Sequence, residues 1–294
     1  MNHPISRRSA IGKTAGAAAL LASATRLPTG LEAADANTAT LKGTINHSAC
    51  RWCYGKIPLD DLCDAAKKMG LHALDLLGPA DFATLKKHDL ICSMVNGTPG
   101  GIPKGLNRVE NHDEIVNYFE RDLPKVAEAG YPNMICFSGN RKGMSNEEGL
   151  ENCVIGAKRI AAIAEKHKVT VCMELLNSKV NHADYMCDHS AWGVELCKLV
   201  GSERFKLLFD IYHMQIMEGD IIHTIHDNHQ HFGHYHTGGV PGRHEIDDTQ
   251  ELYYPAVMKA IVASGYKGFV AQEFNPTGND PLASLRKCVA ICDV

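Results

Sequence analysis

"VTVCMELLNSKVNHADYMCDHSAWGVELCKLVGSERFKLLFDI", residues 169–211, contains one complete unit of the fold. Its two ends, residues 169–175 and 205–211, are short apolar runs of the kind that form buried strands. A stretch with helical periodicity lies between them. This order predicts two parallel strands joined by a helix that covers them.

The same alternation of strand and helix repeats along the chain from residue 41. Further strands are predicted at residues 41–46, 71–78, 90–97, 133–139, 231–237 and 268–274. Helices are predicted from Pro58 to Gly70 and at residues 112–129 and 146–167, with others between the later strands. Eight such units over residues 41–294 match the size of a (β/α)8 barrel, so we predict an α/β fold with a single TIM-barrel catalytic domain. A doubly wound sheet would place a Gly-rich phosphate loop after its first strand, and "NHSACRWCYG" is not one.

The first 36 residues have the features of an export signal rather than of a domain. Arg7 and Arg8 stand side by side in a basic start, an alanine-rich apolar run covers residues 15–27, and a small-residue site ends at Ala36. This pattern predicts a twin-arginine signal peptide over residues 1–36, hence an exported, periplasmic protein. The apolar run is shorter than the ~20 residues that a membrane-spanning helix needs, so no stable membrane insertion is expected.

Composition and charge narrow the class of protein further. The chain has 294 residues, of which 45% are hydrophobic and 22% charged, with a net charge of −4. These values are ordinary for a globular protein and argue against a nucleic-acid partner, which would call for clustered Lys and Arg. The eleven cysteines are scattered, mostly in apolar runs, and are expected in the core rather than in a disulfide scaffold. Cys50 and Cys53 form one Cys-x-x-Cys pair, but no second pair completes a zinc site.

Four predicted strands end in residues that bind metals. Strand five ends in Glu174, strand six in Asp210, strand seven in His236 and strand eight in Glu273. In a TIM barrel these ends meet at the face that carries function. Crowded carboxylates repel one another unless a cation offsets them, so we predict one divalent metal ion, either Mn, Mg, Co or Zn, and no organic cofactor. The alternative is that each carboxylate pairs with a Lys, an Arg or a backbone amide at the rim.

The histidine-rich stretch "HFGHYHTGGVPGRHE", residues 231–245, contributes one of these candidate ligands. Strand alternation puts His234 and His236 on the same inward face. His236 lies nearer the end of the strand and can bind the metal. His234 lies deeper and is predicted to be a hydrogen-bonded residue of a barrel layer.

Other residues near the strand ends are candidate substrate contacts. Arg243 follows the flexible turn "TGGVPGR" and could reach over the barrel mouth, or could instead pair with Glu245 or Asp247 at the surface. His213 could bind a substrate oxygen or simply cap the turn after strand six. Trp52 after strand one and Asn177 after strand five complete the predicted substrate-binding set, with Trp52 as an apolar wall for a sugar.

A family resemblance rests on four segments, which are "MELLNSK" (173–179), "FDIYHMQIMEGD" (209–220), "VPGRHEIDDTQELYYP" (240–255) and "GYKGFVAQEFNP" (265–276). They resemble the hydroxypyruvate isomerase group of the xylose-isomerase-like TIM-barrel superfamily. The resemblance implies that the four residues at the strand ends hold a divalent metal and that Glu174 and Glu273 exchange protons with the substrate. It also implies that His213 and Arg243 contact the substrate. One departure is His236, because hydroxypyruvate isomerases usually carry Gln there and ketose 3-epimerases carry His.

The resemblance implies a metal-dependent isomerase that acts on a sugar or small hydroxy-carbonyl compound through an enediolate. A proton returned to the adjacent carbon gives isomerisation, and one returned to the opposite face gives epimerisation. The alternatives are a ketose 3-epimerase, a metal-dependent lyase or dehydratase on a 3-keto-sugar or glycoside, and a non-catalytic sugar-binding module. A DNA-repair endonuclease is disfavoured, because strands two and three end in "LLG" and "VNG" rather than in further histidines. The expected partner is a small carbohydrate, and the oligomeric state stays open, a homo-oligomer included.

Overall fold

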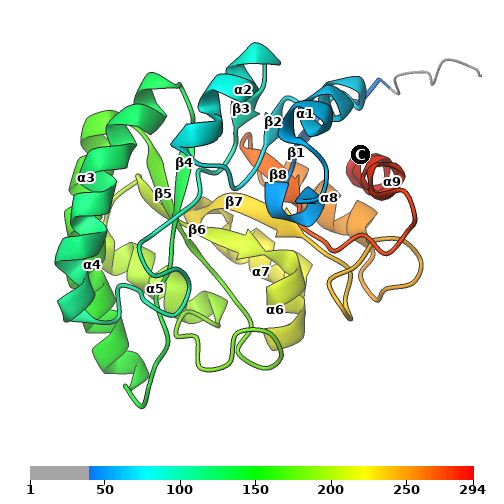
Figure 1. Cartoon of the computed structure of the whole chain (residues 1–294). Helices are drawn as coiled ribbons and strands as arrows, with labels where there is room; N and C mark the ends of the chain where they lie inside the picture. Colours follow the sequence, from blue (N-terminus) through cyan, green and yellow to red (C-terminus); the bar gives the residue numbers. More distant parts are fainter. Residues whose placement is uncertain (1–39) are drawn as a thin grey trace, which may run out of the picture. The chain divides into compact units, whose positions relative to one another are not determined.

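Eight parallel strands form the centre of the computed structural model, which describes residues 40–294 (Figure 1). The predicted signal peptide, residues 1–36, lies outside the described residues. Each strand is a short, mostly buried run. The strands are β1 (Asn46–Ala49), β2 (Ala73–Leu74), β3 (Ile91–Cys92), β4 (Asn133–Cys136), β5 (Thr170–Glu174), β6 (Phe205–Asp210), β7 (Phe232–Thr237) and β8 (Phe269–Gln272).

The strands follow one another around a closed ring. Six of them are hydrogen-bonded in the order β1-β8-β7-β6-β5-β4, and β2 pairs with β3. Parallel bridges join the remaining neighbours, since Cys50 pairs with Asp75 and Val95 pairs with both Leu77 and Met134. The prediction of an α/β fold with a (β/α)8 barrel is therefore confirmed.

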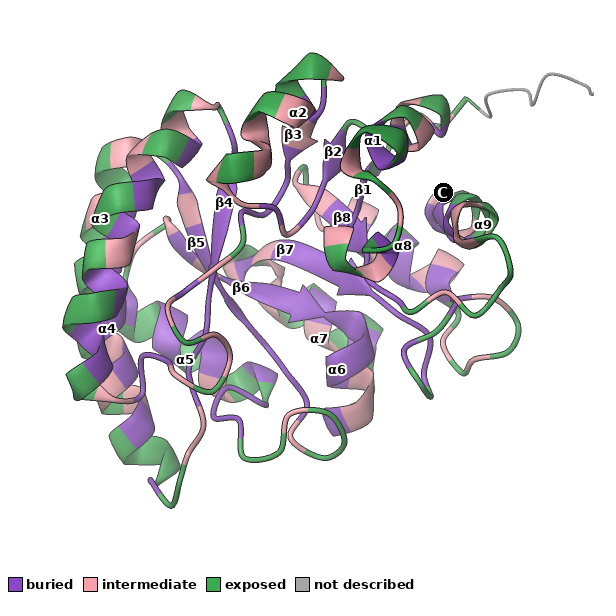
Figure 2. Cartoon of the chain, in the orientation of Figure 1, coloured by how far each residue is buried: buried purple, intermediate pink, exposed green. Residues whose placement is uncertain are grey.

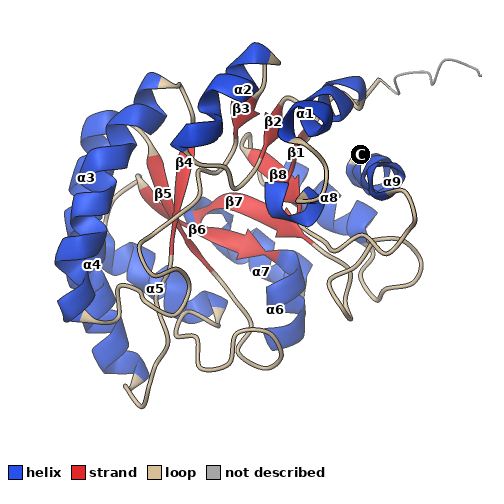
Figure 3. Ribbon diagram, in the orientation of Figure 1, coloured by secondary structure: helices blue, strands red, loops and turns tan. Residues whose placement is uncertain are grey.

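Helices pack around the outside of the strands (Figure 3). They are α1 (Leu59–Lys68), α2 (Phe82–Lys87), α3 (His112–Glu128), α4 (Asn146–His167), α5 (Ser190–Val200), α6 (Ile211–Met217), α7 (Ile221–Asn228), α8 (Tyr254–Ala263) and α9 (Pro281–Cys292). Figure 2 shows buried residues along the strands and exposed residues along the outer sides of α3 and α4. None of the helices in the described part of the chain is long and apolar enough to cross a membrane.

Local sequence signals explain where the longest helix begins and ends. The Ser145 hydroxyl accepts a hydrogen bond from the Glu148 N–H at 3.1 Å and caps the first turn of α4. Lys168 ends the helix in the left-handed conformation, with φ of +57°. The predicted range of 146–167 is that of the helix, and the range predicted for α3 differs by one residue.

The prediction of a first strand at residues 41–46 is wrong. Gly43 has φ of +77°, which is incompatible with a strand. The strand instead begins at Asn46, whose side-chain amide donates to the Lys267 carbonyl oxygen at 2.8 Å. From that point β1 pairs with β8, so tertiary pairing rather than the apolar run decides where the strand lies. β2 and β3 are also much shorter than the ranges 71–78 and 90–97.

All eleven cysteines are free, and ten of them are buried. Burial raises the pKa of most of these thiols, for example to about 12 for Cys197. The prediction that cysteines belong to the core is confirmed for these ten. Cys53 is partly exposed.

The loop after β7 is tied to the segment after β8. Its residues 238–245 fold back on themselves, because the Gly239 N–H donates to the His244 carbonyl oxygen at 2.9 Å. The Arg243 carbonyl oxygen then accepts from the Asn275 N–H at 2.7 Å. These bonds fix the backbone from which the Arg243 side chain extends.

Glu245 anchors the end of this loop. Its carboxylate accepts from the Thr277 N–H at 2.9 Å, the Thr277 hydroxyl at 2.8 Å and the Ser284 hydroxyl at 2.7 Å. Burial opposes ionisation, but these hydrogen bonds outweigh it and lower the pKa of Glu245 to about 2.

We predict that Glu245→Gln lowers the free energy of unfolding by about 2 kcal/mol at pH 7, because hydrogen bonds to a charged acceptor are lost. The folded-state pKa lies below the unfolded value of ~4.3, so this stabilisation is complete above about pH 5 and is lost as the pH falls toward 2. Urea unfolding at pH 7 and at several lower pH values measures both effects. Glu151→Gln, at an exposed position of α4, is the control. A Glu245→Gln loss that stays constant across this pH range would contradict the assignment.

Candidate active site

The four predicted metal ligands meet at the carboxyl ends of four successive strands. Glu174 and Asp210 are the last residues of β5 and β6, His236 is the penultimate residue of β7, and Glu273 directly follows β8. One ligand atom from each of the four lies within 4.8 Å of the others. All four side chains are buried, so the structure brings together the set that the sequence singled out.

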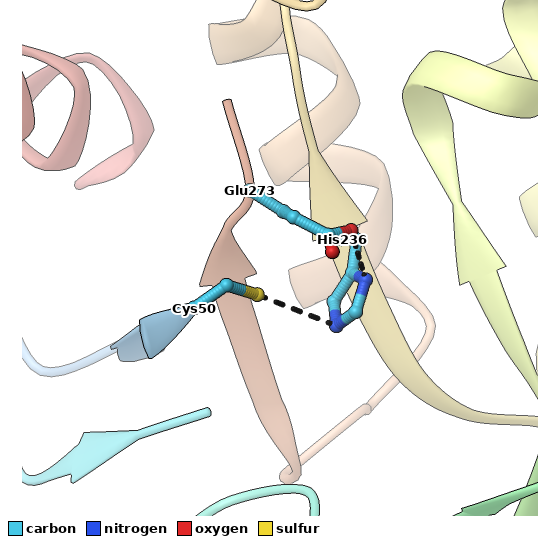
Figure 4. A group of neighbouring side chains, drawn as sticks. All are labelled: Cys50, His236 and Glu273. Atoms are coloured by element: carbon cyan, nitrogen blue, oxygen red, sulfur yellow. Dashed lines mark hydrogen bonds and ion pairs between the residues drawn. The ribbon is translucent and has the colours of Figure 1, made fainter. Parts of the chain in front are cut away.

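One ring nitrogen of His236 faces the three carboxylates. Its Nδ1 lies 2.6 Å from Glu273 Oε2, 3.5 Å from Glu174 Oε1 and 3.9 Å from Asp210 Oδ2. Figure 4 shows His236 between Cys50 and Glu273, with a different ring nitrogen directed to each. Nδ1 is fully buried and makes no hydrogen bond of acceptable geometry. A buried nitrogen without a hydrogen bond, facing three carboxylates, fits a metal ligand.

The Arg243 guanidinium contributes positive charge to this group. Its Nη2 lies 2.7 Å from Asp210 Oδ2 and also contacts Glu273 Oε2. The guanidinium carbon lies 5.7 Å from the centre of the Trp52 ring and 5.1 Å from that of Tyr212. The alternative of a surface arginine is therefore wrong, since Glu245 bonds to other partners.

Burial and mutual repulsion separate the pKa values of the three carboxyl groups. Burial raises the pKa of Asp210 to about 7, and the charge of Glu273 adds to the rise, although Arg243 opposes it. Burial likewise raises the pKa of Glu174. Burial also opposes ionisation of Glu273, but attraction to Arg243 and His236 outweighs it and holds its pKa well below the ordinary range. Glu273 is therefore ionised. Asp210 and Glu174 would be ionised more readily if further positive charge lay nearby.

His213 and Asn177 lie on one side of this group. The Asp210 side chain accepts from the His213 N–H at 3.1 Å and so caps α6. The His213 ring reaches into the site, where its Nε2 lies 2.6 Å from Arg243 Nη1 and its Nδ1 accepts from the Asn177 N–H at 3.2 Å. Burial and the positive charge of Arg243 lower the pKa of His213 well below its usual value. The Asn177 side-chain oxygen accepts from the N–H groups of two residues further along its own loop, so this side chain shapes the loop.

Trp52 reaches the same group from the segment after β1. Its indole Nε1 donates to Glu273 Oε1 at 2.6 Å, and 45% of its surface remains exposed. It therefore holds a carboxylate as well as presenting an aromatic face to solvent.

Asp75 also belongs to this group of side chains but was not among the residues predicted from the sequence. This fully buried residue directly follows β2, with Oδ1 3.2 Å from His236 Nε2 and Oδ2 2.8 Å from His234 Nε2. Burial opposes its ionisation, but attraction to the two histidines outweighs this and lowers its pKa below the ordinary range. The available signal was an acidic residue inside the apolar run "LHALDLLG" (71–78). His234 is buried beside Asp75 as an inward-facing residue of β7, but neither of its ring nitrogens makes the hydrogen bond that was predicted.

Comparison with known proteins identifies the family. A family model described as Xylose isomerase-like TIM barrel matches residues 63–288, so the chain belongs to this family. The 2-oxo-tetronate isomerase of Pectobacterium atrosepticum is 25% identical over 236 residues, which cover 76% of this chain and 89% of that protein. A Xenopus laevis homologue named as a hydroxypyruvate isomerase is 23% identical over 260 residues, which cover 82% of this chain and 94% of that protein.

Solved structures agree with this placement. A Brucella melitensis protein described as AP endonuclease, family 2, superimposes with a TM-score of 0.72 and 25% identity over 82% of this chain and 97% of its own. The 3-keto-D-glucoside 4-epimerase of E. coli superimposes with a TM-score of 0.71 over 84% of this chain and 98% of its own. Its identity is 19%, so this second likeness shows the fold alone.

We predict that Arg243→Ala lowers the free energy of unfolding by about 3 kcal/mol in the presence of a chelator, because it leaves buried carboxylates without their partner. Urea unfolding in EDTA measures the loss. The control is Arg159→Ala, since Arg159 pairs with the exposed Asp113 and such pairs contribute less than about 1 kcal/mol. A loss no larger than that of the control would show that Arg243 does not balance the charge of the site.

Proposed function

We propose that this protein is a divalent-metal-dependent isomerase that acts on a small hydroxy-carbonyl compound through an enediolate. The observation that carries the proposal is the convergence of Glu174, Asp210, His236 and Glu273, with one ligand atom from each within 4.8 Å of the others. Two of the four are glutamates, and a proton-transfer reaction at adjacent carbons needs two groups that can exchange protons.

These four residues would hold the cation. Three oxygen ligands and one nitrogen ligand suit Mn²⁺, Mg²⁺, Co²⁺ or Zn²⁺. A divalent cation supplies Lewis-acid stabilisation of the negative charge that develops on a substrate carbonyl oxygen. The raised pKa values of Asp210 and Glu174 support this role, because both carboxylates gain from additional positive charge.

The two glutamates would carry the proton. Glu273, which is ionised and so can accept a proton, would remove the proton from the carbon beside the carbonyl group. Glu174, on the opposite side of His236 in the strand order, would return a proton to the enediolate. Return to the adjacent carbon completes isomerisation, and return to the opposite face of the first carbon completes epimerisation.

The substrate would lie against Arg243, His213 and Trp52. The names of the relatives, 2-oxo-tetronate isomerase and hydroxypyruvate isomerase, suggest a small hydroxy-acid with a carbonyl group. A guanidinium suits the carboxylate of such an acid because its donors form a planar fork. The exposed face of Trp52 would cover the carbon chain.

A ketose 3-epimerase is the second candidate. His236 favours it, since histidine at this position resembles the epimerases more than the hydroxypyruvate isomerases. Export by the twin-arginine route, which rests on Arg7 and Arg8, is part of the proposal. It gives weight to the lyase or dehydratase alternative on a 3-keto-sugar or glycoside.

The test is solvent-deuterium incorporation into hydroxypyruvate, 2-oxo-tetronate and ketose substrates. We expect incorporation with Mn²⁺ that stops in EDTA, and a fall of about 100-fold or more in Glu273→Gln, because general-base catalysis contributes 10²–10⁴-fold. Glu151→Gln is the matched control. Undiminished incorporation in Glu273→Gln would rule out its role in proton transfer.

The products separate the candidate reactions. A product that differs from the substrate only in the position of its carbonyl group, with the label on the adjacent carbon, identifies an isomerase. A product that keeps the carbonyl position but has inverted configuration at the neighbouring carbon identifies an epimerase. Loss of water or an aglycone identifies a lyase. Sugar binding that survives EDTA without any exchange would identify a binding module and end the proposal.

A further inference from the structure

Hydrogen bonds hold the backbone and the side chain of Asp75 in place next to His236, one of the four candidate metal ligands. The Asp75 N–H donates to the Ala49 carbonyl oxygen at 2.8 Å, and its own carbonyl oxygen accepts from the Arg51 N–H at 2.9 Å. One bond goes to the last residue of β1 and the other to the segment that follows it, so the backbone is fixed on that side. The Ser93 hydroxyl, on the residue directly after β3, donates to Asp75 Oδ2 at 2.6 Å and so fixes the side chain.

The two carboxylate oxygens of Asp75 are directed at the two inward histidines of β7. Oδ1 lies 3.2 Å from His236 Nε2 in hydrogen-bond geometry, and Oδ2 lies 2.8 Å from His234 Nε2. An ionised carboxylate only accepts hydrogen bonds. His236 must therefore donate through Nε2, and this nitrogen carries the proton.

The proton on Nε2 determines what the other ring nitrogen can do. An imidazole that binds a cation is neutral and carries hydrogen on one nitrogen only, so a proton on Nε2 of His236 would leave the lone pair of Nδ1 for the cation. Nδ1 is the nitrogen that faces Glu174, Asp210 and Glu273. Metal-binding histidines are commonly oriented in this way by a carboxylate on the far nitrogen.

We propose that Asp75 is a positioning residue that holds His236 in the tautomer and ring orientation needed to bind the divalent cation through Nδ1. The proposal rests on the proposed function, because it presumes that a cation binds at this site. Position 236 is also where the chain departs from the hydroxypyruvate isomerases, which usually carry Gln there. A glutamine would have no imidazole tautomer for Asp75 to select.

The neighbouring Cys50 does not replace Asp75 in this role. Its Sγ lies 3.9 Å from His236 Nε2 and 3.7 Å from Asp75 Oδ1. Burial and the surrounding carboxylates raise the pKa of its thiol well above the ordinary value. A protonated thiol at these distances is a weak partner, so the carboxylate is the acceptor that orients the ring.

The test is Mn²⁺ affinity measured by isothermal titration calorimetry. We expect Asp75→Asn to weaken Mn²⁺ binding by about 10–100-fold, the usual effect of losing such a partner. Asp122→Asn, at another buried and ion-paired aspartate on α3, is the matched control and should leave the affinity unchanged. In a His236→Gln background, Asp75→Asn should change the affinity by less than about twofold, because no imidazole remains to be oriented.

Three outcomes would overturn the proposal. They are wild-type affinity in folded Asp75→Asn, an equal loss in the His236→Gln background, and an equal loss in Asp122→Asn. Absence of Mn²⁺ binding by the unsubstituted chain would instead contradict the proposed function itself.

A second measurement needs no change at Asp75 and so remains decisive if that variant fails to fold. Long-range ¹H–¹⁵N spectra of the Zn²⁺-loaded protein report which nitrogen of each histidine carries hydrogen, and His236→Gln identifies the signal. We expect the proton on Nε2 of His236. A proton on Nδ1 would overturn the proposal.

Discussion

Three buried carboxyl groups that converge on one point are the constraint around which the rest of the site is arranged. Glu174, Asp210 and Glu273 come from three strand ends, and each would lose its hydration without a compensating charge. The Arg243 guanidinium compensates part of this cost and is itself held by the loop that Glu245 anchors. Because the barrel brings these strand ends together, the negative charge of the three carboxylates must be offset by positive charge within the site.

The sequence was sufficient for the barrel and for the four converging residues because both depend on repetition. Each strand end is marked by a polar residue after an apolar run, and parallel strands place such ends on one face. The first strand was misplaced because its position depends on pairing with β8, which no local pattern encodes. Asp75 was not predicted for a similar reason. β2 has only two residues, and the apolar run 71–78 continues past its end, so the sequence does not mark Asp75 as a residue at a strand end.

The position of Arg243 shows a further limit of inference from sequence. Spacing along the chain is compatible with two positions of this side chain. It could extend to the barrel mouth, or it could form a surface ion pair with Glu245, which is only two residues away. The backbone bond to Asn275 removes the ambiguity by turning the loop toward Glu273. Contacts between the ends of different strands thus decide the roles of residues that their own segments leave open.

The ten buried thiols have a consequence for how the protein must be handled. While the barrel is intact, solvent oxidants do not reach them, and no pair is joined. Once the chain opens, all eleven become available for random cross-linking, so unfolding in air would trap the polypeptide in mispaired forms. A folded molecule would tolerate oxidising conditions that its nascent chain would not.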